Sequence, residues 1–432
     1  MKLVRNGSAA LLFLLFTVVV HQDAFAQTFQ QELSRSGIVH ERVVWMKNPS
    51  REAVVSWSTR KPGKDHRVYY DVISHKGNVK KYAHQVKTFR DGEFTRVSDD
   101  MKLTVPTFYH HAHLKGLQPS TAYYLVIASD DEVTQEYYFI TAPEDDRPIA
   151  VLQGGDSRMG RGITDADATM APVHNDRQKM NMRIAALVEQ HPEIIAFAHG
   201  GDYTMRAELR YLERWMQDAE LTTTSAGRLV PIIPTRGNHD MAVGFTEVFA
   251  WPDLETDYYY STRLSSEVAV ITLNTEISMG GDQREWLEKE LAAIRPEHKW
   301  VFVQYHRPAY TSVKNPQRAA NQRQFWVPLF EKHNVDLVCE SDDHALKRTL
   351  PIRNDAHDPE NGIIYVGDGG LGVPPRTPDT SRWWLQEPGF AKSVHHVFLL
   401  EFGADKMRVR AVGIDGEIID DIQLEPRAVL AD

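Results

Sequence analysis

From about residue 146 onward, short apolar segments alternate with longer segments in which apolar residues recur at helical spacing. Strands are predicted at 149–152, 194–198, 229–233, 268–273, 300–303 and 335–338. Helices are predicted around 180–188, at 207–218 and at 282–294. Strands that alternate with helices of this length are typical of a layered α/β domain, so residues 146–432 are expected to form one.

Residues 27–145 follow a different pattern, in which strand-like segments are separated by turn signals. The segments 53–58 and 67–72 alternate apolar and polar side chains, and a Pro-Ser turn precedes an aromatic segment that begins near residue 122. This pattern predicts a small antiparallel all-β sandwich. His110, His111 and His113 fall within one predicted strand, and we interpret them as structural.

The first 26 residues have the composition of a secretory signal peptide. Lys2 and Arg5 precede an apolar run from Ala9 to Val20, and Ala24-Phe25-Ala26 supplies the small residues needed for cleavage. The run is about 12 residues long, whereas roughly 20 are needed to span a bilayer. We therefore predict cleavage rather than a retained membrane anchor, and a secreted or periplasmic protein.

Cysteine content and charge exclude two further classes. Cys339 is the single cysteine, so no intrachain disulfide can form, and no cysteine near the cleavage site offers a lipid attachment point. The formal net charge is −10, which argues against nucleic acid as the main partner.

Five of the predicted strands are followed by a polar loop, and each of these loops carries carboxylate, amide or imidazole side chains. The loops are Gly154-Gly155-Asp156, Gly200-Gly201-Asp202, Gly237-Asn238-His239-Asp240, Tyr305-His306-Arg307-Pro308 and Ser341-Asp342-Asp343-His344. Ligands of α/β sheets bind at the carboxyl ends of the strands, so these loops can converge on one spot. Carboxylate and imidazole together are typical ligands of Zn, Mn or Fe, and the loops therefore predict a metal site.

The order of these loops resembles that of the calcineurin-like metallophosphoesterases, and among them the purple acid phosphatases. Gly367-Asp368-Gly369-Gly370 resembles a segment that follows the metal motifs in that family. The segments 108–124 and 139–143 resemble the end of the fibronectin type III-like domain that precedes the catalytic domain in larger members. The resemblance implies an all-β sandwich at 27–145 and an α/β catalytic domain at 146–432, in which a four-layer β-sandwich is flanked by helices.

The resemblance also implies a role for each loop residue. Asp202 would bridge two metal ions, Asp156 and His344 would hold the first, and Asn238 and His306 would hold the second. The ions would be divalent or trivalent, of Fe, Mn or Zn. His239 would be an outer acid that protonates the leaving group.

Three neighbours of these ligands allow more than one interpretation. Asp240 either orients His239 through its other ring nitrogen or is an exposed loop acid. Arg158 and Arg307 either clamp phosphate oxygens or are ordinary surface arginines.

Three positions depart from the family pattern. The tyrosinate ligand comes three residues after the bridging aspartate, where this chain has Met205, and Tyr203 is expected to point elsewhere. A second histidine that follows His306 in the family is absent, and Lys314 or Arg318 is the available positive charge in that stretch. Asp342 stands where the family has a histidine.

Asp342 is interpreted either as a ligand or as a turn cap. As a ligand of the second metal it would make the site more anionic and shift its preference toward Mn, Mg or Fe over Zn. As a cap it would leave the second metal weakly held or missing.

The predicted function is hydrolysis of a small phosphorylated substrate, a phosphate monoester, by attack of metal-bound hydroxide. Two alternatives remain open: a phosphodiesterase, and a degenerate non-catalytic relative that binds a metal or a phosphate group. Resemblance in fold does not separate them, because function belongs to the site.

Overall fold

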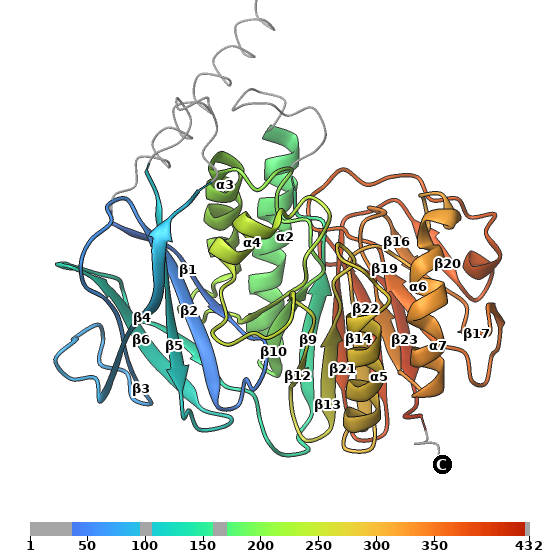
Figure 1. Ribbon diagram of the computed structural model, residues 1–432, viewed down its shortest axis with the longest axis horizontal. Coiled ribbons are helices and arrows are strands. Elements are labelled where there is room, and N and C mark those ends of the chain that lie inside the picture. Colours follow the sequence, from blue (N-terminus) through green and yellow to red (C-terminus); the bar gives the residue numbers. More distant parts are fainter. Residues whose placement is uncertain (1–36, 96–105, 159–170, 428–432) are drawn as a thin grey trace, which may run out of the picture.

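The computed structural model describes residues 37–95, 106–158 and 171–427. The predicted signal peptide lies outside these ranges. Figure 1 shows the N-terminal strands on one side and, beside them, a larger part in which sheets lie between helices. Within the described ranges, every helix is too short or too polar to span a bilayer.

The N-terminal part is one antiparallel sheet that bends over on itself. Its strands are β1 (Ile38–Val44), β2 (Glu52–Thr59), β3 (His66–Asp71), β4 (His84–Glu93), β5 (Phe108–Lys115), β6 (Ala122–Ser129), β7 (Glu132–Val133) and β8 (Tyr137–Ile140). The first half of β4 pairs with β3 and the second half pairs with β5, so the sheet turns over at this strand. Trp57 on β2 donates a hydrogen bond across the layers to Ser129 on β6. The predicted sandwich is therefore formed by a single folded sheet.

The larger part contains two sheets. The first holds β9 (Ile149–Gly154), β10 (Ile194–His199), β11 (Ile232–Pro234), β21 (His396–Phe402), β22 (Met407–Gly413) and β23 (Ile418–Leu424). The second holds β12 (Tyr260–Arg263), β13 (Val268–Thr272), β14 (Trp300–Gln304), β15 (Leu337–Cys339), β19 (Ile364–Gly367), β16 (Leu346–Arg348) and β20 (Phe390–Lys392). Strands β9 to β11 run parallel in the first sheet, and β13, β14, β15 and β19 run parallel in the second. A hairpin of β17 (Ile352–Arg353) and β18 (Ala356–His357) stands apart.

Side-chain alternation along β14 explains how the layers stack. Trp300 and Phe302 belong to the core between the sheets, where the rings of Phe302 and Phe402 stack at 5.5 Å. Val301 and Val303 belong to a second core with Leu287 of helix α5. Because successive strand residues point to opposite faces, a strand buried on both faces must lie between two layers.

Helices cover the outer faces of both sheets (Figure 1). They are α2 (Ala171–Gln190), α3 (Leu209–Ala219), α4 (Ala242–Val248), α5 (Asp282–Ile294), α6 (Ala320–Phe325) and α7 (Val327–Lys332). Apolar residues of α2 and α3 join the core of the first sheet, while those of α5 and α7 pack on the second. The predicted fold class, an all-β part followed by two sheets between helices, is confirmed.

The two parts of the chain share one continuous sheet. Strand β1 pairs in parallel with β11 at Val44 and Ile232, and the Trp45 amide donates to the Ile232 carbonyl oxygen at 2.9 Å. The resulting sheet has 14 strands. Backbone pairing therefore anchors the N-terminal part directly beside the strand that precedes the Gly237 loop.

Candidate metal centre

Four of the predicted ligands converge in one buried cluster. Ligand atoms of Asp156, Asp202, His306 and Asp342 all lie within 4.8 Å of one another. Asp156 and Asp202 follow β9 and β10 of the first sheet, whereas His306 and Asp342 follow β14 and β15 of the second. The loops converge because the parallel strands of both stacked sheets end at the same edge.

The ligand loops adopt a conformation that few residues tolerate. The φ angles of Asp156, Asp202, Asp342 and His344 are 58°, 57°, 77° and 59°, all in the left-handed region. Each such residue costs roughly 1–3 kcal/mol and persists where the surroundings impose it, as they do at ligand sites. The sharp turn brings each side chain back over the end of its strand.

Two of the loops touch backbone to backbone. A Cβ atom placed on Gly237 would lie 2.4 Å from the amide nitrogen of Asp202. Glycine is therefore required at 237, and the Gly-Asn-His-Asp loop packs directly on the Asp202 loop.

Asp240 joins these two loops. Its carboxylate accepts hydrogen bonds from the backbone amides of Asp202 at 2.7 Å, Gly237 at 2.9 Å and Tyr203 at 2.9 Å. Burial and the neighbouring Asp202 carboxylate raise the pKa of Asp240 to about 7. Asp240 therefore serves as a buried clamp that sets the position of Asp202.

The interpretation of Asp240 as a partner of His239, or else as an exposed acid, is wrong on both counts. The Nδ1 atom of His239 donates instead to the carbonyl oxygen of Met205 at 2.8 Å. Asp240 is 4% exposed and its oxygens point at backbone amides. Asp240 stands two positions after the candidate ligand Asn238, and the spacing of residues in this loop does not show that its side chain turns into the protein.

The Nε2 atom of His306 faces two carboxylates. Its Nδ1 atom donates to the Gly200 carbonyl oxygen at 2.8 Å, which leaves Nε2 facing Asp202 Oδ1 at 3.2 Å and Asp342 Oδ1 at 3.6 Å. Burial lowers the pKa of His306, but the charges and hydrogen bonds of the nearby carboxylates raise it well above its ordinary value. A ring nitrogen aimed at two carboxylates needs a positive charge between them, from a proton on Nε2 or from a metal ion, and Nδ1 bonds to a backbone carbonyl oxygen as it does in many metal-ligating histidines.

Three ligand atoms here are buried and have no hydrogen-bond partner among the described residues. They are Asp156 Oδ1, Asn238 Oδ1 and His306 Nε2. Buried polar atoms are almost always paired, so unpaired ones indicate a missing ligand. Because carboxylate, amide and imidazole donors together suit Fe, Mn or Zn, the residues fit the predicted metal ions.

His344 and Arg158 complete the wall of the cluster. His344 Nε2 lies 3.1 Å from Asp156 Oδ1, and Arg158 Nε donates to Asp202 Oδ2 at 3.2 Å. Arg158 is buried, which excludes its interpretation as an ordinary surface arginine. Arg307 pairs through two nitrogens with Glu276 at 2.7 and 3.0 Å.

The cluster opens into a cavity of about 770 Å³. Its lining residues are Arg158, Met205, Asn238, His239, Arg307, Val313, Lys314, Arg318, Asp342, His344, Val373, Pro374, Pro375 and Arg376. The metal motifs do not indicate Arg376, since it lies beyond the Gly367 to Gly370 segment. The sequence signal that marks it is the Pro374-Pro375 pair, which stiffens the backbone before it.

Asp342 lies in the cluster and is buried. Its backbone amide donates to Asp156 Oδ2 at 2.7 Å, and its Oδ1 atom faces both His306 and the ammonium group of Lys314. Burial opposes ionisation, yet the hydrogen bond and charge of His306 and the charge of Lys314 hold the pKa of Asp342 well below its ordinary value. The geometry places an ionised carboxylate where a ligand of the second metal is expected.

Asp342→His is therefore expected to move metal preference toward Zn. An imidazole is a softer donor than a carboxylate and removes one negative charge from the cluster. Metal analysis after dialysis against equimolar Mn and Zn would measure the change, with the exposed Asp405→His as the matched control. An Mn-to-Zn ratio that stays at the wild-type value would show that Asp342 is not a ligand.

Tyr203 does not reach the cluster. Its ring stacks on His199 at 4.0 Å and its hydroxyl group points at the His199 carbonyl oxygen at 3.4 Å. Burial and the nearby Asp240 raise its pKa well above the ordinary value, so the phenol stays neutral. A neutral phenol of this kind is a poor metal ligand.

Ferric protein is accordingly expected to show no tyrosinate charge-transfer band, and Tyr203→Phe should leave its visible spectrum unchanged. Met205 lines the cavity, with its sulfur 3.8 Å from Arg158 Nη1, so Met205→Tyr is the variant expected to introduce such a band. Absorption spectra of the three iron-loaded proteins provide the measurement. A strong wild-type band that disappears in Tyr203→Phe would contradict the assignment.

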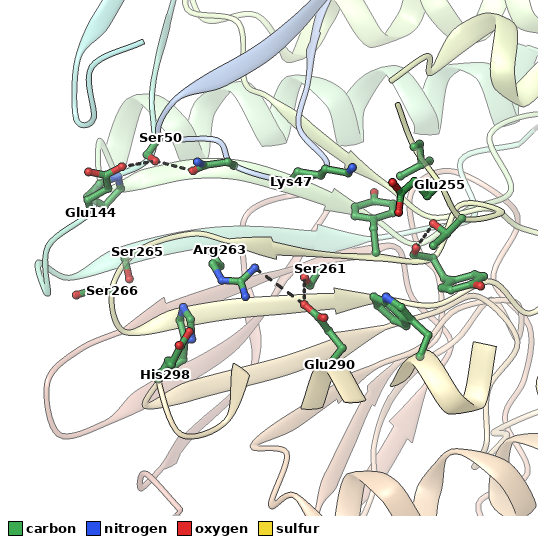
Figure 2. A pocket seen from close by; sticks show the side chains of 18 residues that line it. Lys47, Ser50, Glu144, Glu255, Ser261, Arg263, Ser265, Ser266, Glu290 and His298 are labelled. Carbon is green, nitrogen blue, oxygen red and sulfur yellow. Dashed lines mark hydrogen bonds and ion pairs between the residues drawn. The ribbon is translucent and has the colours of Figure 1, made fainter. Parts of the chain in front are cut away.

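A second cavity, of about 640 Å³, lies away from the cluster (Figure 2). Residues of the N-terminal part, such as Lys47, Ser50 and Glu144, form one wall. Its polar groups largely pair with each other: the Ser50 hydroxyl donates to Glu144 at 2.9 Å, and that of Ser261 donates to Glu290 at 2.5 Å. Because these pairs satisfy one another, this cavity is a weaker candidate for the chemistry.

Two histidines of the N-terminal part, His66 and His110, are also paired. His66, Asp91 and His110 come close enough to suggest a metal group. However, His66 bonds to Ser129 and the Pro62 carbonyl oxygen, and His110 bonds to Asp91 and Thr59. With both nitrogens of each ring in hydrogen bonds, these side chains are structural.

Two family models match the chain in succession. The purple acid phosphatase N-terminal domain matches residues 39–141, and the calcineurin-like phosphoesterase model matches residues 173–346. Together they cover more than half of the chain. The second match includes the loops of Asp202, Asn238, His306, Asp342 and His344.

Curated relatives are similar at moderate identity. An uncharacterized protein of Mycobacterium tuberculosis is 27% identical over 77% of this chain and 63% of its own length. A purple acid phosphatase of Glycine max is 24% identical over 61% and 60%, and Fe(3+)-Zn(2+) purple acid phosphatase 12 of Arabidopsis thaliana is 23% identical over 73% and 68%. The chain thus spans about three fifths of the length of the first two of these relatives.

Solved structures share the fold. The purple acid phosphatase PPD1 from yellow lupin (Lupinus luteus) seeds superposes with a TM-score of 0.71 at 19% identity, covering 92% of this chain and 78% of its own. The structure of PhoD gives a TM-score of 0.63 at 10% identity, with 92% of both chains covered. At these identities the likeness establishes the architecture of both parts.

Proposed function

Because this chain belongs to the calcineurin-like phosphoesterases and resembles the purple acid phosphatases in both of its parts, we propose that it is an exported enzyme that hydrolyses phosphate monoesters. One observation carries the proposal. Within the described residues, three buried atoms of candidate metal ligands lack a hydrogen-bond partner, and their residues belong to the carboxylate–histidine cluster or line a cavity that also holds positively charged side chains. Such a site suits a metal-assisted reaction of an anionic substrate.

The family resemblance divides these residues between two metal positions, and we adopt that division. Asp156 and His344 would hold one ion, Asn238, His306 and Asp342 the other, and Asp202 would lie between them. Two bound ions supply Lewis acidity toward the phosphoryl oxygens and make water a stronger nucleophile at neutral pH. The Fe and Zn pair in the name of the Arabidopsis relative is one candidate, although the carboxylate of Asp342 favours Fe or Mn at its position.

Proton transfer is assigned to His239. Its Nδ1 atom is fixed by the Met205 carbonyl oxygen, and its Nε2 atom lies 3.9 Å from Asp202 Oδ2. The ring lines the cavity and is partly exposed, so Nε2 can reach a leaving-group oxygen. Arg158 and Arg307 border the same space, and besides their bonds to Asp202 and Glu276 their guanidinium groups can contact phosphoryl oxygens.

Metal analysis together with turnover tests the proposal. Purified protein, loaded in turn with Mn, Zn, Mg or Fe, should hydrolyse p-nitrophenyl phosphate faster than bis-p-nitrophenyl phosphate. Asn238→Ala should abolish that turnover, because the second ion loses its amide ligand. No turnover with any metal, combined with less than about one bound ion per chain, would favour the non-catalytic alternative; preference for the diester would favour a phosphodiesterase.

The proposal that the enzyme is exported rests on residues 1–26, which are predicted to be a cleaved signal peptide. A mature protein that begins at Gln27 in the periplasm or the medium would support it. Full-length protein retained in the cytoplasm would contradict it.

A further inference from the structure

The cavity holds more positive charge than one phosphate group requires. Five cationic side chains line it, from Arg158, Arg307, Lys314, Arg318 and Arg376. Its volume of about 770 Å³ is that of a site for a whole organic molecule. This local excess contrasts with the net charge of −10 of the entire chain.

Three of these cations already have carboxylate partners. Arg158 donates to Asp202 at 3.2 Å. Arg307 forms two bonds to Glu276, and the Lys314 ammonium group contacts Asp342. These three balance charges that belong to the metal cluster and its rim.

Arg318 and Arg376 differ, because neither has a carboxylate partner in the part of the chain that the structure describes. Arg376 Nη1 donates only to the main-chain oxygen of Asp342 at 3.3 Å, and Arg318 lies exposed on the short helix η3 (Pro316–Ala319). A guanidinium group in a cavity whose charge is not balanced by a carboxylate can bind an anion.

The fold holds the backbone of both arginines close to the metal loop. Asp343 accepts the backbone amides of Val313 at 2.8 Å and Lys314 at 3.2 Å, which fixes the segment leading to Arg318. On the other segment, the amide of Arg376 donates to the His344 carbonyl oxygen at 2.7 Å. The segments that carry both arginines are therefore anchored by their backbone to residues 343 and 344.

Apolar side chains occupy much of the remaining wall. They are Met205, Val313, Val373, Pro374 and Pro375. A wall of this kind suits the carbon skeleton of an organic substrate.

We propose that Arg318 and Arg376 form a binding subsite for a second phosphate group, so that the substrate is a small bisphosphorylated organic molecule. The inference rests on the proposed hydrolase function and names its substrate class. Water attacks phosphorus at the metal end and the P–O bond of that ester breaks. Inorganic phosphate leaves, His239 protonates the alcohol oxygen, and the alcohol keeps its second phosphate on the two arginines.

Matched substrates provide the test. The wild-type holoenzyme should show a kcat/KM for phosphate release at least about tenfold higher with fructose 1,6-bisphosphate than with fructose 6-phosphate, since a charge-assisted hydrogen bond contributes about that factor. In R318Q/R376Q this preference should fall about tenfold, mainly through a higher KM for the bisphosphate. Arg284→Gln, on the outer helix α5 and absent from the cavity lining, should keep the wild-type preference.

The outcomes separate the two proposals. Hydrolysis of both sugars without preference, or a preference that survives in R318Q/R376Q with wild-type metal content, would overturn the subsite and leave the phosphatase function intact. If neither sugar is hydrolysed with any metal, the phosphatase function fails. In that case calorimetry with the same two sugars decides the subsite: tighter binding of the bisphosphate, lost in R318Q/R376Q, supports it, and equal binding overturns it.

Discussion

Asp202→Asn is expected to fold normally, to lose most of its bound metal and to lose phosphatase activity by more than about a hundredfold. Loss of a partner behind a metal ligand already costs roughly 10- to 100-fold, and Asp202 is assigned as the ligand between both ions. Asparagine tolerates the left-handed backbone at 202, where φ is 57°, so the loop is kept.

The side-chain amide that Asp202→Asn introduces would also face hydrogen-bond donors where the carboxylate faces them now. Asp202 Oδ1 accepts from the His239 backbone amide at 2.9 Å, and Oδ2 accepts from Arg158 at 3.2 Å. In Asp202→Asn, one of these two oxygens becomes an NH₂ group, which cannot accept the hydrogen bond and instead faces another donor. Measured quantities are metal per chain, turnover of p-nitrophenyl phosphate and the thermal midpoint. Asp253→Asn is the matched control, because Asp253 is exposed and its backbone is also in the left-handed region, with a φ angle of 55°. Wild-type metal content in Asp202→Asn would refute the bridging role.

Asp240→Ala is expected to destabilise the protein by about 3 kcal/mol or more and to lower its metal affinity. Three backbone amides lose their acceptor, and each buried donor left unpaired costs about 1–3 kcal/mol. Since two of those amides belong to Asp202 and Tyr203, the loop that carries the bridging carboxylate is released. The effect on metal binding distinguishes this positioning role from a merely structural one.

Urea unfolding of the metal-free protein and metal titration of the folded protein measure the two effects separately. Asp240→Asn keeps one acceptor oxygen and should fall between wild type and Asp240→Ala in both measurements. Asp405→Ala removes an exposed acid and should match wild type. Unfolding and metal affinity that are both unchanged in Asp240→Ala would contradict the assigned clamp.

Elements whose pattern is local were predictable from the sequence. The helix predicted at 282–294 is α5 with the same bounds, because its apolar residues recur with the helical period and strands flank it. The strand predicted at 229–233 begins later, at Ile232, since the Leu229 amide bonds instead to the Tyr138 carbonyl oxygen. Tyr138 lies 91 positions away along the chain, so the local periodicity of the sequence cannot predict this hydrogen bond.

The positions of the candidate ligands were predictable for a related reason. Asp156, Asp202, His306 and Asp342 each stand directly beyond a strand, and strand ends bring loops to one edge wherever the strands run parallel. The identity of the hydrogen-bond partners was not predictable. His239 bonds to Met205, and Asp240 bonds to amides of another loop, because the approach of two loops decides which donor meets which acceptor.

By itself, the sequence determined which residue types stand at each strand end, the two kinds of layer, and the absence of disulfides, since all of these depend on local pattern or composition. Only the tertiary structure decided that the candidate ligands come from two stacked sheets, that β1 pairs with β11, and that Arg318 and Arg376 line the cavity with no carboxylate partner among the described residues. These properties arise from contacts between segments far apart along the chain. The distances between such segments, and the charges of their buried groups, depend on packing and burial and not on the spacing of residues in the sequence.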